Sequence, residues 1–254
     1  MRKLEIDIFK NIALILMIIY HTFFMIDFMK IDHFNMNSGL LKIIASISHN
    51  TFITLAGVNL YLSYKNNKKK KFFKKQNKRI FKIIKGAVFM NIFSYFAFGD
   101  ILYIKFGILH FMATAILMSY PIVHSKYLTL IVSMTFYLIS NYVKNNSHKM
   151  DFCEYSPLTC FILGIYNKHN MHIASYDHFS ILHSFGLFSF GIFLGHLFYE
   201  NDQLKEIDTK NNNELVQIFE KFSKNTFNIY LLHWPILYII FYIYSLILIK
   251  KIEN

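Results

Sequence analysis

The chain contains few of the residues that build tight backbone loops, with only 9 glycines, 3 prolines and 2 cysteines among 254 residues. None of the glycines are clustered, so the sequence gives little support for a loop that cradles phosphates. A Walker loop, a dinucleotide-binding fingerprint and a serine-hydrolase elbow are all missing. The function classes that depend on these glycine-containing motifs are therefore disfavoured.

Long apolar runs make up most of the chain. Hydrophobic residues account for 54% of it, and the mean hydropathy is +0.33. Windows of about 20 residues predict seven membrane-spanning segments, near residues 12–28, 40–64, 83–98, 106–123, 128–143, 179–199 and 226–249. We therefore expect an all-α, polytopic membrane helix bundle that forms one domain over residues 1–254. The first run is too long for a cleavable signal, so we expect it to remain as the first span.

Basic residues predict how the chain is oriented. Residues 65–82 contain ten Lys and Arg and no acid, so the positive-inside rule places this basic loop and the N-terminus in the cytoplasm, and the C-terminus outside. Contact with anionic lipids explains the basic run, and we expect no nucleic-acid partner. A second inner loop, 200–224, reads as a solvated linker. The outer loop, 144–178, includes a short apolar stretch at 157–165 that predicts a re-entrant or interfacial segment.

The outer loop also carries cysteines and histidines. Cys153 and Cys160 lie on the expected oxidising face, where a disulfide and two unpaired thiols are both allowed. His169 and His172 have i,i+3 spacing, but a zinc site needs a third and a fourth ligand. We therefore interpret these two histidines as solvated loop residues and expect no metal.

Four histidines interrupt the apolar segments: His21, His49, His110 and His183. An ionisable ring at membrane depth is expensive, so each must face a protein interior or a wet cavity. In the predicted topology these rings share the outer side with His33 and Asp177, which indicates a site there. A neutral imidazole oriented by a carboxylate is a general base or a nucleophile, and Asp177 is the carboxylate expected to orient one. The alternative for each ring alone is a hydrogen bond to a backbone carbonyl, and this suits His233 next to Pro235.

Six segments resemble, in order, the catalytic-domain family of heparan-α-glucosaminide N-acetyltransferase and its prokaryotic relatives. They are residues 7–17 with Tyr20-His21, residues 51–63, Phe106-Gly107-Ile108-Leu109-His110, residues 175–179, residues 191–195, and residues 225–235, which end in Leu231-Leu232-His233-Trp234-Pro235. The chain departs from the family at Lys10-Asn11, where Arg-Gly is usual. It also departs at Ser180, His183 and Ser184, where bacterial relatives commonly have prolines and a tryptophan.

The resemblance implies transfer of an acetyl or other acyl group from cytosolic acyl-CoA to an amino-sugar or glycan acceptor on the far side of the membrane. Acetyl-CoA is then a co-substrate, and a plasma-membrane location is expected. Family members use a histidine just beyond the first span, which matches His33 after a shift of one residue. The resemblance also matches His21 to a polar site residue, and Asp177 to the family's aspartate.

The expected site residues follow from these matches and from the predicted topology. The catalytic set is His33, His21 and Asp177. The expected pocket-lining residues are His110, His183, His49, His233 and Asn59. The adenosine phosphates of the acyl donor are expected to contact Lys10, Lys78 and Arg79.

Two other function classes remain open from the sequence. One is a proton-coupled transporter or channel lined by the histidines, although no internal repeat of the kind common in transporters is found. The other is a non-catalytic membrane scaffold in which the histidines only satisfy backbone groups. The acceptor, the choice between N- and O-acylation and the oligomeric state are left undetermined by the residues.

Overall fold

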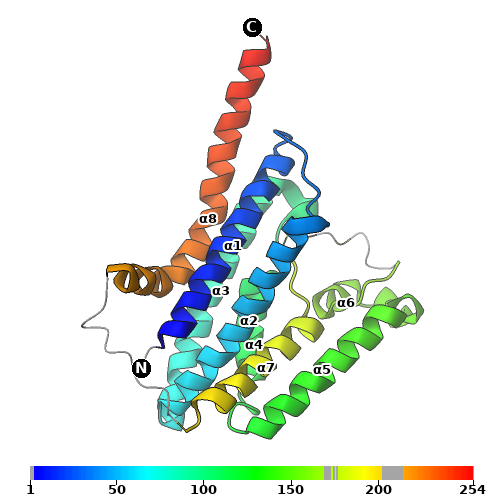
Figure 1. Cartoon of the computed structure of the whole chain (residues 1–254). Coiled ribbons are helices and arrows are strands. Elements are labelled where there is room, and N and C mark those ends of the chain that lie inside the picture. Colours follow the sequence, from blue (N-terminus) through cyan, green and yellow to red (C-terminus); the bar gives the residue numbers. More distant parts are fainter. Residues whose placement is uncertain (1–2, 169–172, 174, 176, 202–213, 254) are drawn as a thin grey trace. The chain divides into compact units, whose positions relative to one another are not determined.

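The computed structural model describes residues 3–168, 173, 175, 177–201 and 214–253, and these residues contain helices and no strands (Figure 1). The expected all-α class is thus confirmed. The α-helices are α1 (Leu4–Phe28), α2 (Gly39–Lys65), α3 (Lys69–Leu102), α4 (Ile108–Met118), α5 (Lys126–Asn146), α6 (Pro157–Leu163), α7 (Ile181–Tyr199) and α8 (Glu214–Glu253), and the short 3-10 turns are η1 (Ser147–Lys149) and η2 (Asp151–Glu154).

These helices belong to two compact units. Unit 1 consists of Met1–Phe52 and Lys205–Asn254 and contains α1, the first part of α2, and α8. Unit 2 consists of Ile53–Leu204 and contains the rest of α2 together with α3 to α7.

Within the described residues, five helices are long and apolar enough to cross a membrane: α1, α2, α3, α7 and α8. Helix α4 has only 11 residues, so it rises ~17 Å at 1.5 Å per residue, well short of a hydrocarbon core of about 30 Å. Helix α5 has 21 residues, but Lys, Thr, Ser and Asn interrupt its apolar run. The expected count of seven spans is therefore not confirmed.

Large apolar side chains cover the exposed faces of these helices. On α8, side chains with exposed fractions of 51–59% include Ile236, Ile239, Ile240, Ile243 and Ile247. On α5 the buried residues are Thr129, Ser133 and Val143, whereas large apolar side chains such as Ile131 and Leu138 are exposed. This distribution is the reverse of that on a helix in water, and it favours a hydrocarbon environment around the protein.

One correction concerns the basic segment 65–82, which we expected to be a loop. Helix α2 continues to Lys65 and α3 begins at Lys69, so the segment is almost entirely helical. Lys, Gln and Arg are good helix formers, and a stripe with a spacing of four residues, Phe72, Gln76 and Ile80, is buried. The expected inner loop 200–224 is corrected in the same way, because α8 already begins at Glu214.

In unit 1, α1 and α8 lie side by side (Figure 1). The Asn11 side-chain amide donates to Phe219 O at 2.8 Å, and the Ser223 hydroxyl donates to the Asp7 carboxylate. Asp7 and Asn11 are four residues apart on one face of α1, and both are buried. The Asn11 amide N–H and the Asp7 carboxylate thus find partners on α8, as apolar surroundings favour.

In unit 2, α2 and α7 meet at glycines. A Cβ atom added at Gly191 would lie 2.0 Å from Thr54 O, and one added at Gly57 would lie 2.1 Å from Phe188 O. The two helix backbones are therefore in direct contact, as is typical of small residues between membrane helices. Helix α5 also packs on α7, where Ser133 Oγ donates to Gly186 O at 2.9 Å.

We expect Gly191→Ala to destabilise the protein by ~1–3 kcal/mol, the range for overpacked sites, because its methyl group meets the backbone of α2. Gly186→Ala is the matched control on the same helix, since a Cβ there would lie 3.4 Å from its nearest neighbour. The measurement is the thermal unfolding midpoint of each variant in detergent. Equal midpoints for the two variants would contradict the close contact of the helices.

Candidate active site

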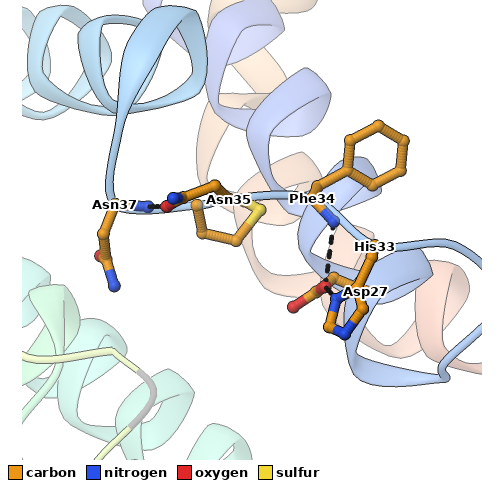
Figure 2. Close-up of a pocket in the computed structure, with 6 residues that line it drawn as sticks. Asp27, His33, Phe34, Asn35 and Asn37 are labelled. Carbon is orange, nitrogen blue, oxygen red and sulfur yellow. Dashed lines mark hydrogen bonds and ion pairs between the residues drawn. The ribbon is translucent and has the colours of Figure 1, made fainter.

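The carboxylate of Asp27 holds His33 just beyond the end of α1. His33 Nδ1 donates to Asp27 Oδ1 at 2.9 Å, and the backbone N–H of Phe34 donates to the same oxygen at 3.1 Å. The two residues line a pocket of about 520 Å³ together with Phe34, Asn35, Met36 and Asn37. Figure 2 shows the imidazole of His33 directed at the carboxylate of Asp27.

This pairing determines which nitrogen of His33 can react. Because Nδ1–H donates to the carboxylate, a neutral ring carries its lone pair on Nε2. The His33 side chain is fully exposed, so Nε2 is accessible from outside. A carboxylate, an imidazole and an accessible second nitrogen form the arrangement that orients histidine bases in many enzymes.

Sequence reasoning missed Asp27 and chose Asp177 as the orienting carboxylate. The available signal was an acid close to the end of the first apolar segment, six residues before His33. A loop that follows a helix can fold back over its last turn, and here residues 29–34 do so. The left-handed backbone of Lys30, with φ of 54°, reverses the chain within this loop.

A pair of imidazoles joins α1 and α8 within unit 1. His21 Nδ1 and His233 Nε2 are 2.9 Å apart, and His233 Nδ1 donates to Tyr230 O at 2.6 Å. The expected carbonyl bond of His233 is thus present, and its acceptor lies in the same helix. Trp234 packs against this pair, with its ring centroid 4.9 Å from that of His21.

In unit 2, Asp177 lies at the N-terminus of α4. Its Oδ2 accepts the backbone N–H of Ile108 at 3.3 Å, and the N–H of Gly107 donates to His110 Nδ1 at 3.2 Å. A Cβ added at Gly107 would lie 2.6 Å from Asp177 Oδ2. A glycine is therefore needed for the carboxylate to reach the helix end, where negative charge is favourable. With its carboxamide turned so that the nitrogen faces acceptors, Asn91 donates to Ala87 O and its nitrogen lies 3.3 Å from His110 Nε2.

The remaining expected site residues are divided between the two units. His49 is half-buried on α2 and Lys10 is half-buried on α1, both in unit 1. In unit 2, the Asn59 side-chain amide donates to Leu55 O of its own helix at 2.7 Å. His183 and Lys78 are exposed on α7 and α3, and Arg79 is half-buried.

The segment before α7 contains a disulfide and a half-buried imidazole. Cys153 and Cys160 form the bridge, so the disulfide is the correct one of the two alternatives that the sequence left open. Phe161 packs against His178 with ring centroids 4.0 Å apart, and the Tyr166 hydroxyl lies 2.5 Å from His178 Nδ1. Burial lowers the pKa of His178 to about 4, and an interaction of the ring with the backbone carbonyl of Phe161 opposes this only in part. His169 and His172 lie outside the described residues.

The low pKa of His178 predicts a loss of stability in acid. Between pH 6.5 and about 4 the unfolded chain binds a proton that the folded chain does not, so the free energy of unfolding falls as the pH falls through this range. His178→Asn should remove at most ~3 kcal/mol of this pH dependence, at 1.36 kcal/mol per pKa unit. Unfolding midpoints between pH 4 and 7 measure the effect. His148→Asn, at an exposed position in the same segment, should keep the full pH dependence. The same acid sensitivity in both variants would contradict the assignment.

Comparison with known proteins gives one match. A family described as heparan-alpha-glucosaminide N-acetyltransferase, catalytic, matches residues 2–235. No curated protein and no solved structure matches the chain. The family match covers nearly the whole chain and confirms the resemblance noted from its motifs. Together with the five long apolar helices, it shows that this integral membrane protein belongs to the heparan-α-glucosaminide N-acetyltransferase catalytic family, a family of acetyltransferase-type enzymes.

Proposed function

We propose that the protein transfers an acetyl group from acetyl-CoA to an amino-sugar or glycan acceptor on the extracytoplasmic side of the membrane. The observation that carries the proposal is the Asp27–His33 pair at an open pocket, with His33 Nε2 accessible. Membership of an acetyltransferase family supports the type of reaction. Asp27 takes the orienting role that the sequence had suggested for Asp177.

The proposed reaction uses His33 as a general base. His33 Nε2 takes a proton from the nitrogen or oxygen of the acceptor while that atom attacks the thioester carbonyl carbon. The tetrahedral adduct then expels the CoA sulfur, which receives the proton from His33. In the variant mechanism, Nε2 itself attacks the thioester, and the acetylated ring passes its acetyl group to the acceptor. Asp27 stabilises the charged imidazole in both cases.

The residues around His33 are suited to a polyhydroxylated acceptor. Asn35 and Asn37 line the same pocket, and each carboxamide offers both a donor and an acceptor to sugar hydroxyls. The Asn37 backbone N–H donates to Asn35 Oδ1 at 3.1 Å, which orders this part of the pocket (Figure 2).

Two features support an extracytoplasmic position for residues 144–178 and a cytosolic position for the start of α3. The Cys153–Cys160 disulfide fits an oxidising compartment. The exposed lysines between Lys68 and Lys82 fit the positive-inside rule and contact with anionic lipids. On the cytosolic side of the membrane, Lys78 and Arg79 can contact the phosphates of an acyl-CoA.

His33→Ala should lower acetyl transfer by at least ~100-fold, the usual contribution of a general base. Asp27→Asn should lower kcat less, because the amide still contacts the ring but no longer stabilises its charge. Asp32→Asn is the matched control, because Asp32 accepts a hydrogen bond from the backbone N–H of His33 and the variant removes the same charge. The measurement is transfer of labelled acetyl from acetyl-CoA to glucosamine-type acceptors by purified protein in vesicles.

The same vesicles distinguish the other function classes. Full transfer by His33→Ala would overturn the role of this residue. Solute uptake without acetyl transfer would favour a transporter or channel. The absence of CoA binding, together with tolerance of His→Asn changes at His21, His33 and His110, would favour a scaffold.

Cysteine labelling in intact cells tests the orientation. The native cysteines are joined in a disulfide, so an introduced thiol is the one that reacts with a membrane-impermeant maleimide. Lys168→Cys should be labelled from outside, and Lys70→Cys should be labelled only after the cells are opened. The reverse pattern would contradict the proposed orientation.

A further inference from the structure

We propose that His233 positions His21 as a second proton acceptor in acyl transfer, an inference that rests on the function proposed above. The two imidazoles contact each other through nitrogens 2.9 Å apart, from α1 and α8 of the same unit. The partner of each ring nitrogen in this contact determines where the protons lie.

The chain of hydrogen bonds begins at a backbone carbonyl. Tyr230 O can only accept, so His233 Nδ1 must donate its proton to it, at 2.6 Å. A neutral ring with its proton on Nδ1 carries the lone pair on Nε2, and this nitrogen faces His21. His21 must then donate from Nδ1, which leaves its own lone pair on Nε2. A charged imidazole within an apolar span is costly, which favours the neutral form of both rings.

The two rings differ in their exposure and in how many of their nitrogens are engaged, and this difference indicates their roles. His233 is only 6% exposed and both its nitrogens are engaged, so it has no free atom for a substrate. His21 is half-buried, and the contact with His233 uses one nitrogen, Nδ1. Trp234 and Tyr20 pack on the His21 ring with centroids at 4.9 and 5.6 Å. His21 is therefore the ring that can accept a proton, and His233 is the positioning residue.

Acetylation of a protonated amine requires the removal of two protons, and therefore two proton acceptors can act in the reaction. Amines are largely protonated near neutral pH, so the ammonium group must lose one proton before its nitrogen can attack. His21 Nε2 accepts this proton and releases it to water. After attack on the thioester, the adduct loses a second proton to His33, which passes it to the leaving CoA sulfur. The products are the acetamide, the CoA thiol and one proton, so the step balances.

Three substitutions of His233 separate positioning from packing. The side-chain oxygen of Gln can reach the place of Nε2 and accept from His21 Nδ1, whereas Asn reaches only the place of Nδ1. We expect His233→Asn and His233→Ala to lower kcat about 10–100-fold, part of the contribution of one general base, with little change in KM for acetyl-CoA. His233→Gln should restore most of kcat. His124→Ala, at an exposed turn outside the pair, is the control.

Nitrogen NMR of protein with isotope-labelled histidine in nanodiscs identifies the tautomer of His21 directly. The signals of His21, assigned by their loss in His21→Asn, should show a proton on Nδ1 in the unmodified protein and in His233→Gln. His233→Ala should show a mixture of tautomers. A proton on His21 Nε2 in the unmodified protein, or full kcat in His233→Ala, would overturn the inference. If the unmodified protein transfers no acetyl group, the proposed function fails, while the nitrogen signals still decide whether His233 orients His21.

Discussion

Within hydrocarbon, a polar side chain has no water to bond, so its partner must come from the protein. This constraint explains the pairing of α1 with α8 in unit 1. Asp7 contacts Ser223, Asn11 contacts Phe219 O, and His21 contacts His233. Three polar residues of α1 thus find partners at successive levels of one neighbouring helix. Each pair also restricts the register of the two helices, because sliding one helix along the other would separate all the pairs together.

The two imidazoles proposed to act in catalysis are held in different ways, according to their surroundings. His33 lies beyond the end of α1 in contact with solvent, and there a charged carboxylate, Asp27, is tolerated as its partner. His21 lies within an apolar span, and its partner is a second neutral ring that is itself bonded to a carbonyl. Both arrangements have the same consequence, because each one leaves Nε2 as the nitrogen that carries the lone pair.

Several residues of the family motifs have structural contacts that account for their identity. Gly107 lets the Asp177 carboxylate reach the first turn of α4, and Gly191 lets α7 touch the backbone of α2. Asn11, where the family usually has glycine, donates to the backbone of α8. A motif read from sequence therefore includes residues that allow close packing, and their contacts identify them.

The sequence by itself determined the helical class and the membrane environment, because long apolar runs have few other stable conformations. It also predicted roles for His21, an imidazole within such a run, and for His33, through the resemblance to the family, and both roles stay predictions. The partners of these rings were decided only by the tertiary structure: His233 is 212 positions from His21, and Asp27 meets His33 because the chain folds back after α1. The helical start of α3 depended likewise on burial of one face, Phe72 and Gln76, against other helices. The local composition of a segment indicates whether water or hydrocarbon surrounds it, whereas a contact between distant residues exists only once the helices have packed.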